Sequence, residues 1–237
     1  MKKYLFIIIA IAFTLPTFAQ QEKNHEIKSE VKELTEFHDV IYQIWHTGWP
    51  QKDINLLVSL TPDVEKGYDK IKNVELSGIL RDKKSKWDDG LKKFRINVEM
   101  YKGAAAKKDS VGILNAAEKL HMQYEALVRI VKPVLKEVDA FHQELYMLYH
   151  YNMPNYDYTK VQKSAIVLKA KMEDLMKAEL SKRMNAKKDA FDKCRTELNT
   201  AVDKLNEVMV KGNDKNAINA AVDAVHSKYQ ELEKVFD

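Results

Sequence analysis

The chain of 237 residues contains little cysteine, glycine or proline. Cys194 is the only cysteine, so no intramolecular disulfide can form, and we expect this residue to be a small boundary residue rather than a reactive thiol. Seven glycines and five prolines leave few helix breakers, and no stretch shows the sustained apolar and polar alternation of a strand. Lys, Glu, Ala, Leu and Met are abundant and favour helix. We therefore predict an all-α fold.

Motifs that carry catalytic chemistry are also missing. The sequence has no phosphate-binding glycine loop, no Ser/His/Asp or Cys/His arrangement of recognised spacing, and no His-Glu-x-x-His. We therefore predict that the protein is not an enzyme. Its 39 basic and 35 acidic residues are interspersed, as on solvated helix faces. No segregated basic face is visible, so a nucleic-acid partner is not expected.

The one long apolar run lies at the N-terminus. Lys2 and Lys3 precede apolar residues 4–15, and Pro16 and Ala19 follow. This order is typical of a secretory signal peptide, and the run is too short to cross a bilayer comfortably. We expect residues 1–19 to be removed by cleavage after Ala19. The mature protein should then be periplasmic or secreted, with no membrane span.

The rest of the chain contains an internal repeat. Residues 37–53 read FHDVIYQIWHTGWPQKD and residues 141–157 read FHQELYMLYHYNMPNYD, with Phe, His, Tyr, His, Pro and Asp at matching places. The separation is 104 residues here (142 − 38) and 105 near the ends of the copies (226 − 121). We predict two copies of one unit, residues 20–130 and 131–237, each long enough to bury its own core.

Breakers divide each copy into four helical segments. In the first copy these cover roughly 24–47, 52–76, 80–106 and a last segment that begins near 109. Pro62 should bend the second segment because proline lacks a backbone donor. Short connections predict an up-down-up-down four-helix bundle in each copy, a tandem duplication. Only Pro133 separates the two copies, so we predict that they share one long, bent helix.

Histidines occupy matching places in the two copies. His38 lies on the apolar seam of the first segment, where an aliphatic residue is expected, and His142 repeats this. The seam residues, spaced by three and four, are Ile27, Val31, Leu34, His38, Ile41 and Trp45. His121 lies near the inward face of the last segment, at about the height of His38 for a rise of ~1.5 Å per residue. We expect His38 to meet His121, and His142 to meet His226.

Carboxylates accompany two of these histidines. Glu118 stands three residues before His121 and Asp223 three before His226, so each pair shares a helix face. Glu-x-x-His is half of the ferritin-like di-iron pattern, but each copy has only one such motif. We therefore predict one mononuclear site per copy, in which imidazole and carboxylate ligands would suit Zn, Cu(II) or Ni.

The repeated segment also places His46 and His150 near the end of their helix. Each lies about 12 Å beyond the preceding histidine of its copy, too far to share one ion with it. Asp53 and Asp157 follow, and we expect them to cap the next helix while the histidines complement the helix dipole. An aspartate can also accept an imidazole N–H behind a metal, so all four remain candidate residues of the metal site.

Two alternatives to a metal site remain open. The histidines can be buried and neutral, hydrogen-bonded to each other or to Tyr42 and Tyr124, in an interaction or scaffold protein without a ligand. For such a protein, the sequence leaves open both the identity of a protein partner and the formation of a homo-oligomer.

The second alternative rests on a resemblance. An exported four-helix unit with an inward histidine on its last helix resembles the soluble b-type cytochrome bundles and, more distantly, the cytochrome c prime class. This resemblance implies an electron carrier with haem b held between His38 and His121, and between His142 and His226. The first-helix ligand would be histidine where that group has methionine. Cys-x-x-Cys-His is absent, which excludes covalent haem attachment.

Overall fold

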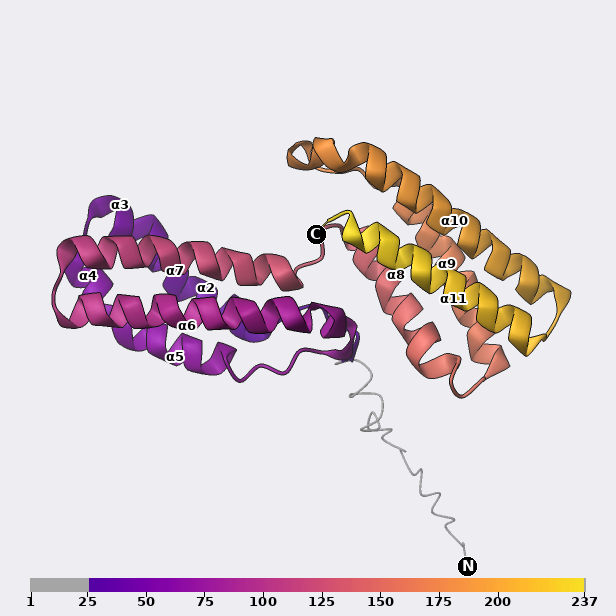
Figure 1. Cartoon of the computed structure of the whole chain (residues 1–237), viewed down its shortest axis with the longest axis horizontal. Coiled ribbons are helices and arrows are strands. Elements are labelled where there is room, and N and C mark those ends of the chain that lie inside the picture. The colour runs from indigo at the N-terminus through magenta and orange to yellow at the C-terminus, as the bar shows by residue number, and fades with distance from the viewer. Residues whose placement is uncertain (1–25, 237) are drawn as a thin grey trace, which may run out of the picture.

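The computed structural model describes residues 26–236 (Figure 1). These residues form helices, turns and connecting segments, and no strand occurs among them. The all-α prediction is therefore confirmed. In this part of the chain no helix has both the length and the apolar character that crossing a membrane requires. The expected signal peptide, residues 1–19 with cleavage after Ala19, lies outside the described residues.

A first group of helices, here called the first half, surrounds one apolar cluster. Its elements are α2 (Lys32–Gln43), η1 (Ile44–Gly48), α3 (Trp49–Gln51), α4 (Ile54–Ser59), α5 (Thr61–Ile71), η2 (Gly78–Lys83), α6 (Lys84–Ala106) and α7 (Ser110–Val131). Helix α2 packs against α5 and α7, and α6 packs along α7. The Phe37 ring meets Phe94 and Tyr124 edge-on, with 5.9 Å between ring centres in each pair. This geometry suits the opposite charges of ring edge and ring face.

A second group, the second half, has its own buried cluster. It contains α8 (Lys136–Met147), η3 (Leu148–Asn152), α9 (Tyr158–Lys177), η4 (Lys182–Lys187), α10 (Lys188–Lys211) and α11 (Lys215–Lys234). Its elements follow the spacing of the sequence repeat. The π-helical turns η1 and η3 start at Ile44 and Leu148, and the 3-10 turns η2 and η4 start at Gly78 and Lys182, 104 residues apart in both cases (148 − 44 and 182 − 78).

The two halves do not share a helix, so that prediction is wrong. Helix α7 ends at Val131, Lys132 is extended with ψ 126°, and α8 begins only at Lys136. Proline disfavours the helical conformation in the residue before it, so Pro133 ends the helix instead of bending it. The halves are joined by a short extended link and point in different directions (Figure 1).

The first predicted helix also differs in its ends. It starts at Lys32 and continues through η1 and α3 to Gln51. Gly48 does not stop it, because its φ of −63° is helical. A Cβ on Gly48 would lie 2.7 Å from Leu57 Cδ2, so glycine serves the close approach of α4. At Pro62, where a bend was predicted, the helix is interrupted, since α4 ends at Ser59 and α5 begins at Thr61.

Candidate functional site

Aromatic and histidine side chains form a continuous surface on α2, η1 and α7. We call this surface the first-half ring face; it consists of His38, Tyr42, Trp45, His46, His121 and Tyr124. The Tyr42 and His46 rings lie 4.7 Å apart. The Trp45 indole stacks on His121 with 4.2 Å between ring centres and an angle of 6°. The surface is therefore organised by ring contacts rather than by charge pairs.

The second half carries the same surface at the equivalent positions. The second-half ring face consists of His142, Tyr146, Tyr149, His150, His226 and Tyr229. Tyr146 and His150 lie 4.7 Å apart, the distance of their counterparts in the first half. Tyr149 stacks on His226 at 4.0 Å and 11°. The repeat thus preserves a three-dimensional arrangement as well as a residue pattern.

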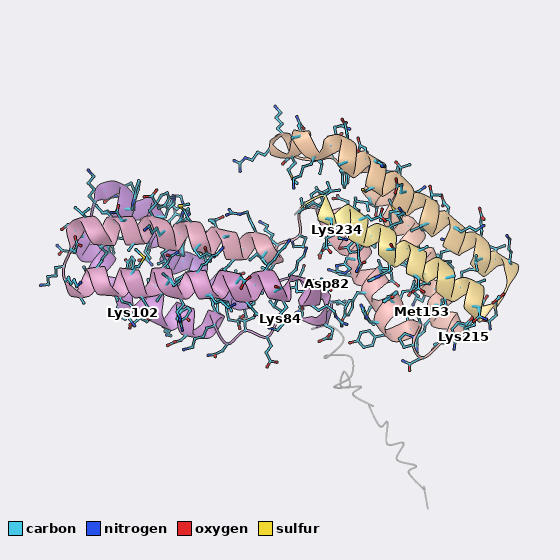
Figure 2. The ribbon with its side chains drawn as sticks, in the orientation of Figure 1. Asp82, Lys84, Lys102, Met153, Lys215 and Lys234 are labelled. Carbon is cyan, nitrogen blue, oxygen red and sulfur yellow. The ribbon has the colours of Figure 1, made fainter. Side chains whose placement is uncertain are left out.

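The two ring faces differ in what covers them. Tyr42 is 53% exposed, whereas its counterpart Tyr146 is 2% exposed and belongs to the buried cluster of the first half. The cover is η2, which packs against α8. Figure 2 shows Asp82 of η2 at the junction of the two halves. The second-half ring face is therefore an internal interface around Tyr146, whereas His38, Tyr42 and His46 of the first-half ring face are exposed. Tyr124 and its counterpart Tyr229 are buried in both halves.

Arg81 makes the main polar contact of this junction. Its guanidinium carbon lies 5.1 Å from the centre of the Tyr146 ring, and Nη2 donates a hydrogen bond to the Tyr146 hydroxyl. That hydroxyl in turn donates to Glu26 at 3.0 Å. A Cβ on Gly78 would overlap both the Tyr146 hydroxyl and the Glu26 carboxylate. Glycine is therefore required for η2 to approach the second half.

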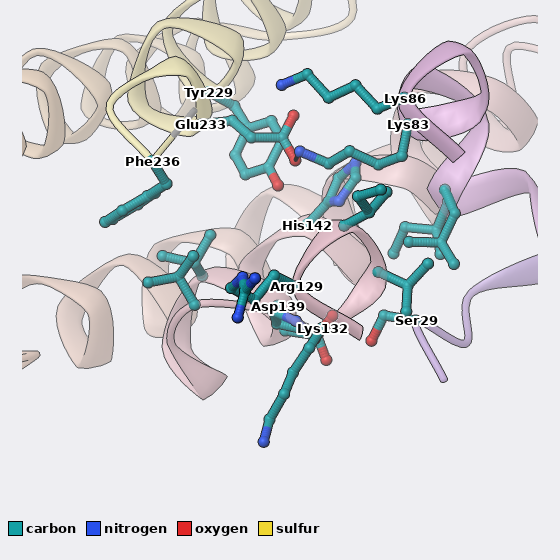
Figure 3. Close-up of a pocket in the computed structure, with 17 residues that line it drawn as sticks. Ser29, Lys83, Lys86, Arg129, Lys132, Asp139, His142, Tyr229, Glu233 and Phe236 are labelled. Atoms are coloured by element: carbon teal, nitrogen blue, oxygen red, sulfur yellow. Dashed lines mark ion pairs between the residues drawn. The ribbon is translucent and has the colours of Figure 1, made fainter. Parts of the chain in front are cut away.

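A cavity of about 250 Å³ lies beside this contact (Figure 3). Its apolar lining comes from η2, the link and α8, and His142 and Tyr229 form part of its wall. Lys83 of η2 reaches Glu233 of α11 at 3.0 Å, and both side chains are only 22% exposed. This ion pair joins the halves on the α11 side of the junction.

Covering the second-half ring face lowers the pKa of its histidines. Burial lowers the pKa of His142 to about 3, and positive charge on Lys83, His226 and His150 acts in the same direction. Burial, together with Arg81, also lowers the pKa of His150. Burial lowers the pKa of His226, although nearby carboxylates oppose it. These rings are therefore neutral at pH 7.

The structure does not assemble the predicted metal site. His38 is exposed and lies against the rings of Tyr42 and Tyr124, while His121 stacks on Trp45, about 10 Å further along the first helix. Glu118 and Asp223 are exposed. Within residues 26–236 no group of three His, Cys, Asp or Glu side chains is placed to hold a metal ion.

Two features explain where His38 and His121 lie. The buried seam of the first helix runs through Leu34, Phe37, Ile41 and Ile44, so Phe37 takes the core position that was assigned to His38. Helix α4 packs against α7 near the end of the first helix. The start of α7 therefore lies beyond that end, and His121 is level with Trp45 instead of His38.

A haem between His38 and His121 would need space that other rings occupy. The interior beside α2 is filled by Phe37, Phe94 and Tyr124, and the Tyr124 hydroxyl donates to the Leu34 carbonyl at 3.0 Å. The residues of the first half therefore do not fit a haem at this place.

The structure also tests the predictions for the ends of the helices, where Asp53, Asp157, His46 and His150 lie. Asp53 accepts a hydrogen bond from the Leu56 N–H at 3.0 Å and Asp157 from the Lys160 N–H at 3.2 Å, so the capping is confirmed. His46 and His150 lie in the last turns of η1 and η3, as predicted. Cys194 packs half-buried against the second cluster, and burial raises its pKa.

Sequence reasoning missed η2 as the partner of the second-half ring face. The signal that pointed to it is a difference between the copies, because Gly78 has Lys182 as its counterpart. A glycine inside a short helical turn indicates a close approach by another segment. No protein family, curated protein or solved structure matches this chain.

Proposed function

We propose that this chain is an exported, non-enzymatic interaction protein, made of two copies of an up-down-up-down four-helix bundle, that binds its partner through the first-half ring face. One observation carries the proposal: the same six-residue arrangement occurs twice, and Tyr146 is covered at 2% exposure in one copy whereas its counterpart Tyr42 is 53% exposed in the other. Export rests on the N-terminal pattern, Lys2 and Lys3 before an apolar run.

The covered copy indicates what such a face binds. The second-half ring face receives a protruding turn whose arginine lies over a tyrosine ring, next to the buried Ile79 and Leu80. A guanidinium is attracted to the electron-rich face of an aromatic ring, and aromatic residues and arginine are enriched at protein interfaces. The first-half ring face therefore fits a segment that presents an arginine beside apolar side chains.

Tryptophan fluorescence tests this proposal. Trp45 lies in the first-half ring face beside Trp49, and its counterpart in the second half is Tyr149. The third tryptophan, Trp87, is buried in the first-half core, so the titration uses Trp87→Phe, in which the signal comes from Trp45 and Trp49. A synthetic peptide with the sequence of residues 76–84, LSGILRDKK, is titrated into the purified chain. We expect a saturable change.

The matched variants define the site. In Tyr42→Ala the peptide should bind about tenfold more weakly or worse, as for loss of an aromatic anchor. Ile166→Ala removes a side chain that is 63% exposed on α9, and it should bind like the wild type. An unchanged spectrum, or equal binding by the wild type and Tyr42→Ala, would rule out the first-half ring face as the binding surface.

Metal binding remains a second candidate because of one pair of histidines. His150 and His226 lie with ring centres 6.3 Å apart, and a single ion with bonds of about 2.0 Å can reach both. In the first half, His46 is close enough to affect the pKa of His121. Zn, Cu(II) and Ni are the metals to test by calorimetry on protein without a His tag. Binding that His150→Gln and His226→Gln abolish would support this candidate, and an absence of heat would dismiss it.

A further inference from the structure

We propose that copies of this chain join head to tail, with η4 of one copy on the first-half ring face of the next. The proposal rests on the proposed function of that face and names its partner. Each chain uses one turn and one ring face internally, η2 and the second-half ring face. The equivalent turn is left at the surface, together with His38, Tyr42 and His46 of the equivalent face.

The turn η4 is exposed where η2 is buried. Ile79 and Leu80 of η2 are 4% and 5% exposed, whereas their counterparts in η4, Arg183 and Met184, are exposed and partly exposed. The start of α10, next to η4, projects beyond the neighbouring helices at the end of the second half where the C-terminus lies (Figure 1). Among residues 26–236, the main packing partner of η4 is α10, the helix that follows it.

The chemistry of η4 matches the first-half ring face. Asn185 stands at the place of Arg81, and the guanidinium of η4 comes instead from Arg183, at the place of Ile79. Arg183 can make with the exposed Tyr42 ring the kind of contact that Arg81 makes with Tyr146. Met184 supplies a flexible thioether for Trp45, and sulfur packs well against aromatic rings. Burial raises the pKa of Tyr124, and the nearby carboxylates of Glu125 and Asp39 add to this rise. Glu125 pairs with Arg129 at 3.9 Å, so Asp39 is the carboxylate that offers negative charge for Lys182.

The docking differs from the internal junction in one respect. Lys182 stands at the position of Gly78, so the backbone of η4 cannot approach a tyrosine hydroxyl as closely as η2 does. Contact is made by the side chains of Arg183 and Met184. Because Tyr42 is exposed and not enclosed as Tyr146 is, its ring has room to adjust to them.

The resulting contact is heterologous, since a turn on one copy meets a face on another. A dimer formed in this way still has one free turn and one free face, so further copies can add until a ring closes or a filament forms. The size of the assembly should therefore increase with protein concentration. This behaviour distinguishes the contact from a symmetric pairing of two ring faces.

Complementation between two variants tests the proposal. Arg183→Glu inactivates the turn and leaves the face intact, and Tyr42→Ala inactivates the face and leaves the turn intact. The oligomeric state of each is measured by sedimentation velocity and light scattering at concentrations up to about 1 mM, where weak contacts are populated. Lys163→Glu on α9 is the matched charge control. Circular dichroism checks the fold, and His46→Ala replaces Tyr42→Ala if that variant is disturbed.

We expect the wild type and Lys163→Glu to self-associate, and each inactivated variant to be monomeric. An equimolar mixture of the two should form dimers and nothing larger, because only one turn and one face remain to join. A monomeric mixture, a wild type that stays monomeric, or association that persists in either variant would overturn the proposal. Peptide binding by residues 76–84 is measured separately, so a failure of self-association leaves the proposed function standing if the peptide binds.

Discussion

The guanidinium of Arg81 lies over the ring of Tyr146, 5.1 Å from its centre, and links residues 65 positions apart in the sequence. It is the contact through which the first half closes over the second-half ring face. Each half has its own buried cluster, so this contact affects how the halves are held together more than whether either half folds.

Replacing Arg81 with alanine should loosen the junction. The variant loses a cation–π contact and a hydrogen bond from a charged donor, and we expect the free energy of unfolding to fall by about 1 kcal/mol. Urea denaturation measures the change. Arg183→Ala, at the exposed η4, should leave the stability of the monomer unchanged. Equal stabilities of Arg81→Ala and the wild type would show that the contact contributes nothing.

Gly78→Ala should destabilise the chain, although it adds only one methyl group. The added methyl group meets the Tyr146 hydroxyl and the Glu26 carboxylate, so η2 must withdraw, at a cost of about 1–3 kcal/mol. Gly103→Ala is the matched control. Nothing lies within 4 Å of a Cβ at this exposed helical position, and the change should stabilise α6 by about 0.5–1 kcal/mol. Thermal unfolding of both variants checks the opposite signs.

The position of His142 predicts a loss of stability in acid. The pKa of His142 is about 3 in the folded chain, whereas the ordinary pKa of histidine, 6.5, applies to the unfolded chain. The unfolded chain therefore binds the proton more readily. The contribution to stability is complete above pH 6.5 and is lost as the pH falls from there toward 3. Between pH 7 and pH 5 one such histidine costs about 2 kcal/mol.

Denaturation of the wild type and of His142→Phe at pH 7 and at pH 5 measures this contribution to the free energy of unfolding. The groups around His142 are Lys83 on η2, His150 on η3, His226 and Glu233 on α11, and Asp139 on α8. His150 and His226 still titrate in the variant, so the loss on acidification should shrink without vanishing. A loss as large as that of the wild type would contradict the assignment to His142.

Trp87 offers a test of the first-half core. Within residues 26–236 its indole N–H is buried without a hydrogen-bond partner. The equivalent residue of the second half is Phe191, which is also buried. Trp87→Phe removes the unsatisfied donor together with some volume, so we expect a net change within about 1 kcal/mol. Trp87→Ala should cost about 3–5 kcal/mol, as large aromatic truncations do. Similar losses in both variants would refute this account.

The local parts of the fold followed from the sequence because local chemistry determines them. Asp53 and Asp157 cap their helices, and Pro62 interrupts the second segment, since capping and proline effects act within a few residues. A bend was predicted at Pro133 because no other helix breaker separates the two copies. Its effect on the preceding residue was stronger, and the helix ended there.

The candidate site was less predictable because it depends on register and on long-range contacts. A spacing of three and four residues allows either Phe37 or His38 to be the core residue of this turn. Phe37 has the larger apolar side chain, and it is the one that is buried. The height of His121 could not be estimated without the packing of α4. The junction at Arg81 and Tyr146 depends on how two distant segments meet, which no spacing within either segment encodes.

The π-helical turns have a consequence for how these helices tolerate change in length. Each takes up one residue more than an α-helical turn, which rotates the residues after it by roughly 100°. In η1 this turn carries Trp45 and His46 on the ring face and ends with Gly48 against Leu57. Deleting Thr47 would restore an ordinary turn and bring a side chain to the place of Gly48, whereas Thr47→Ala keeps every residue in position. The number of residues in this turn is therefore constrained more tightly than their identity.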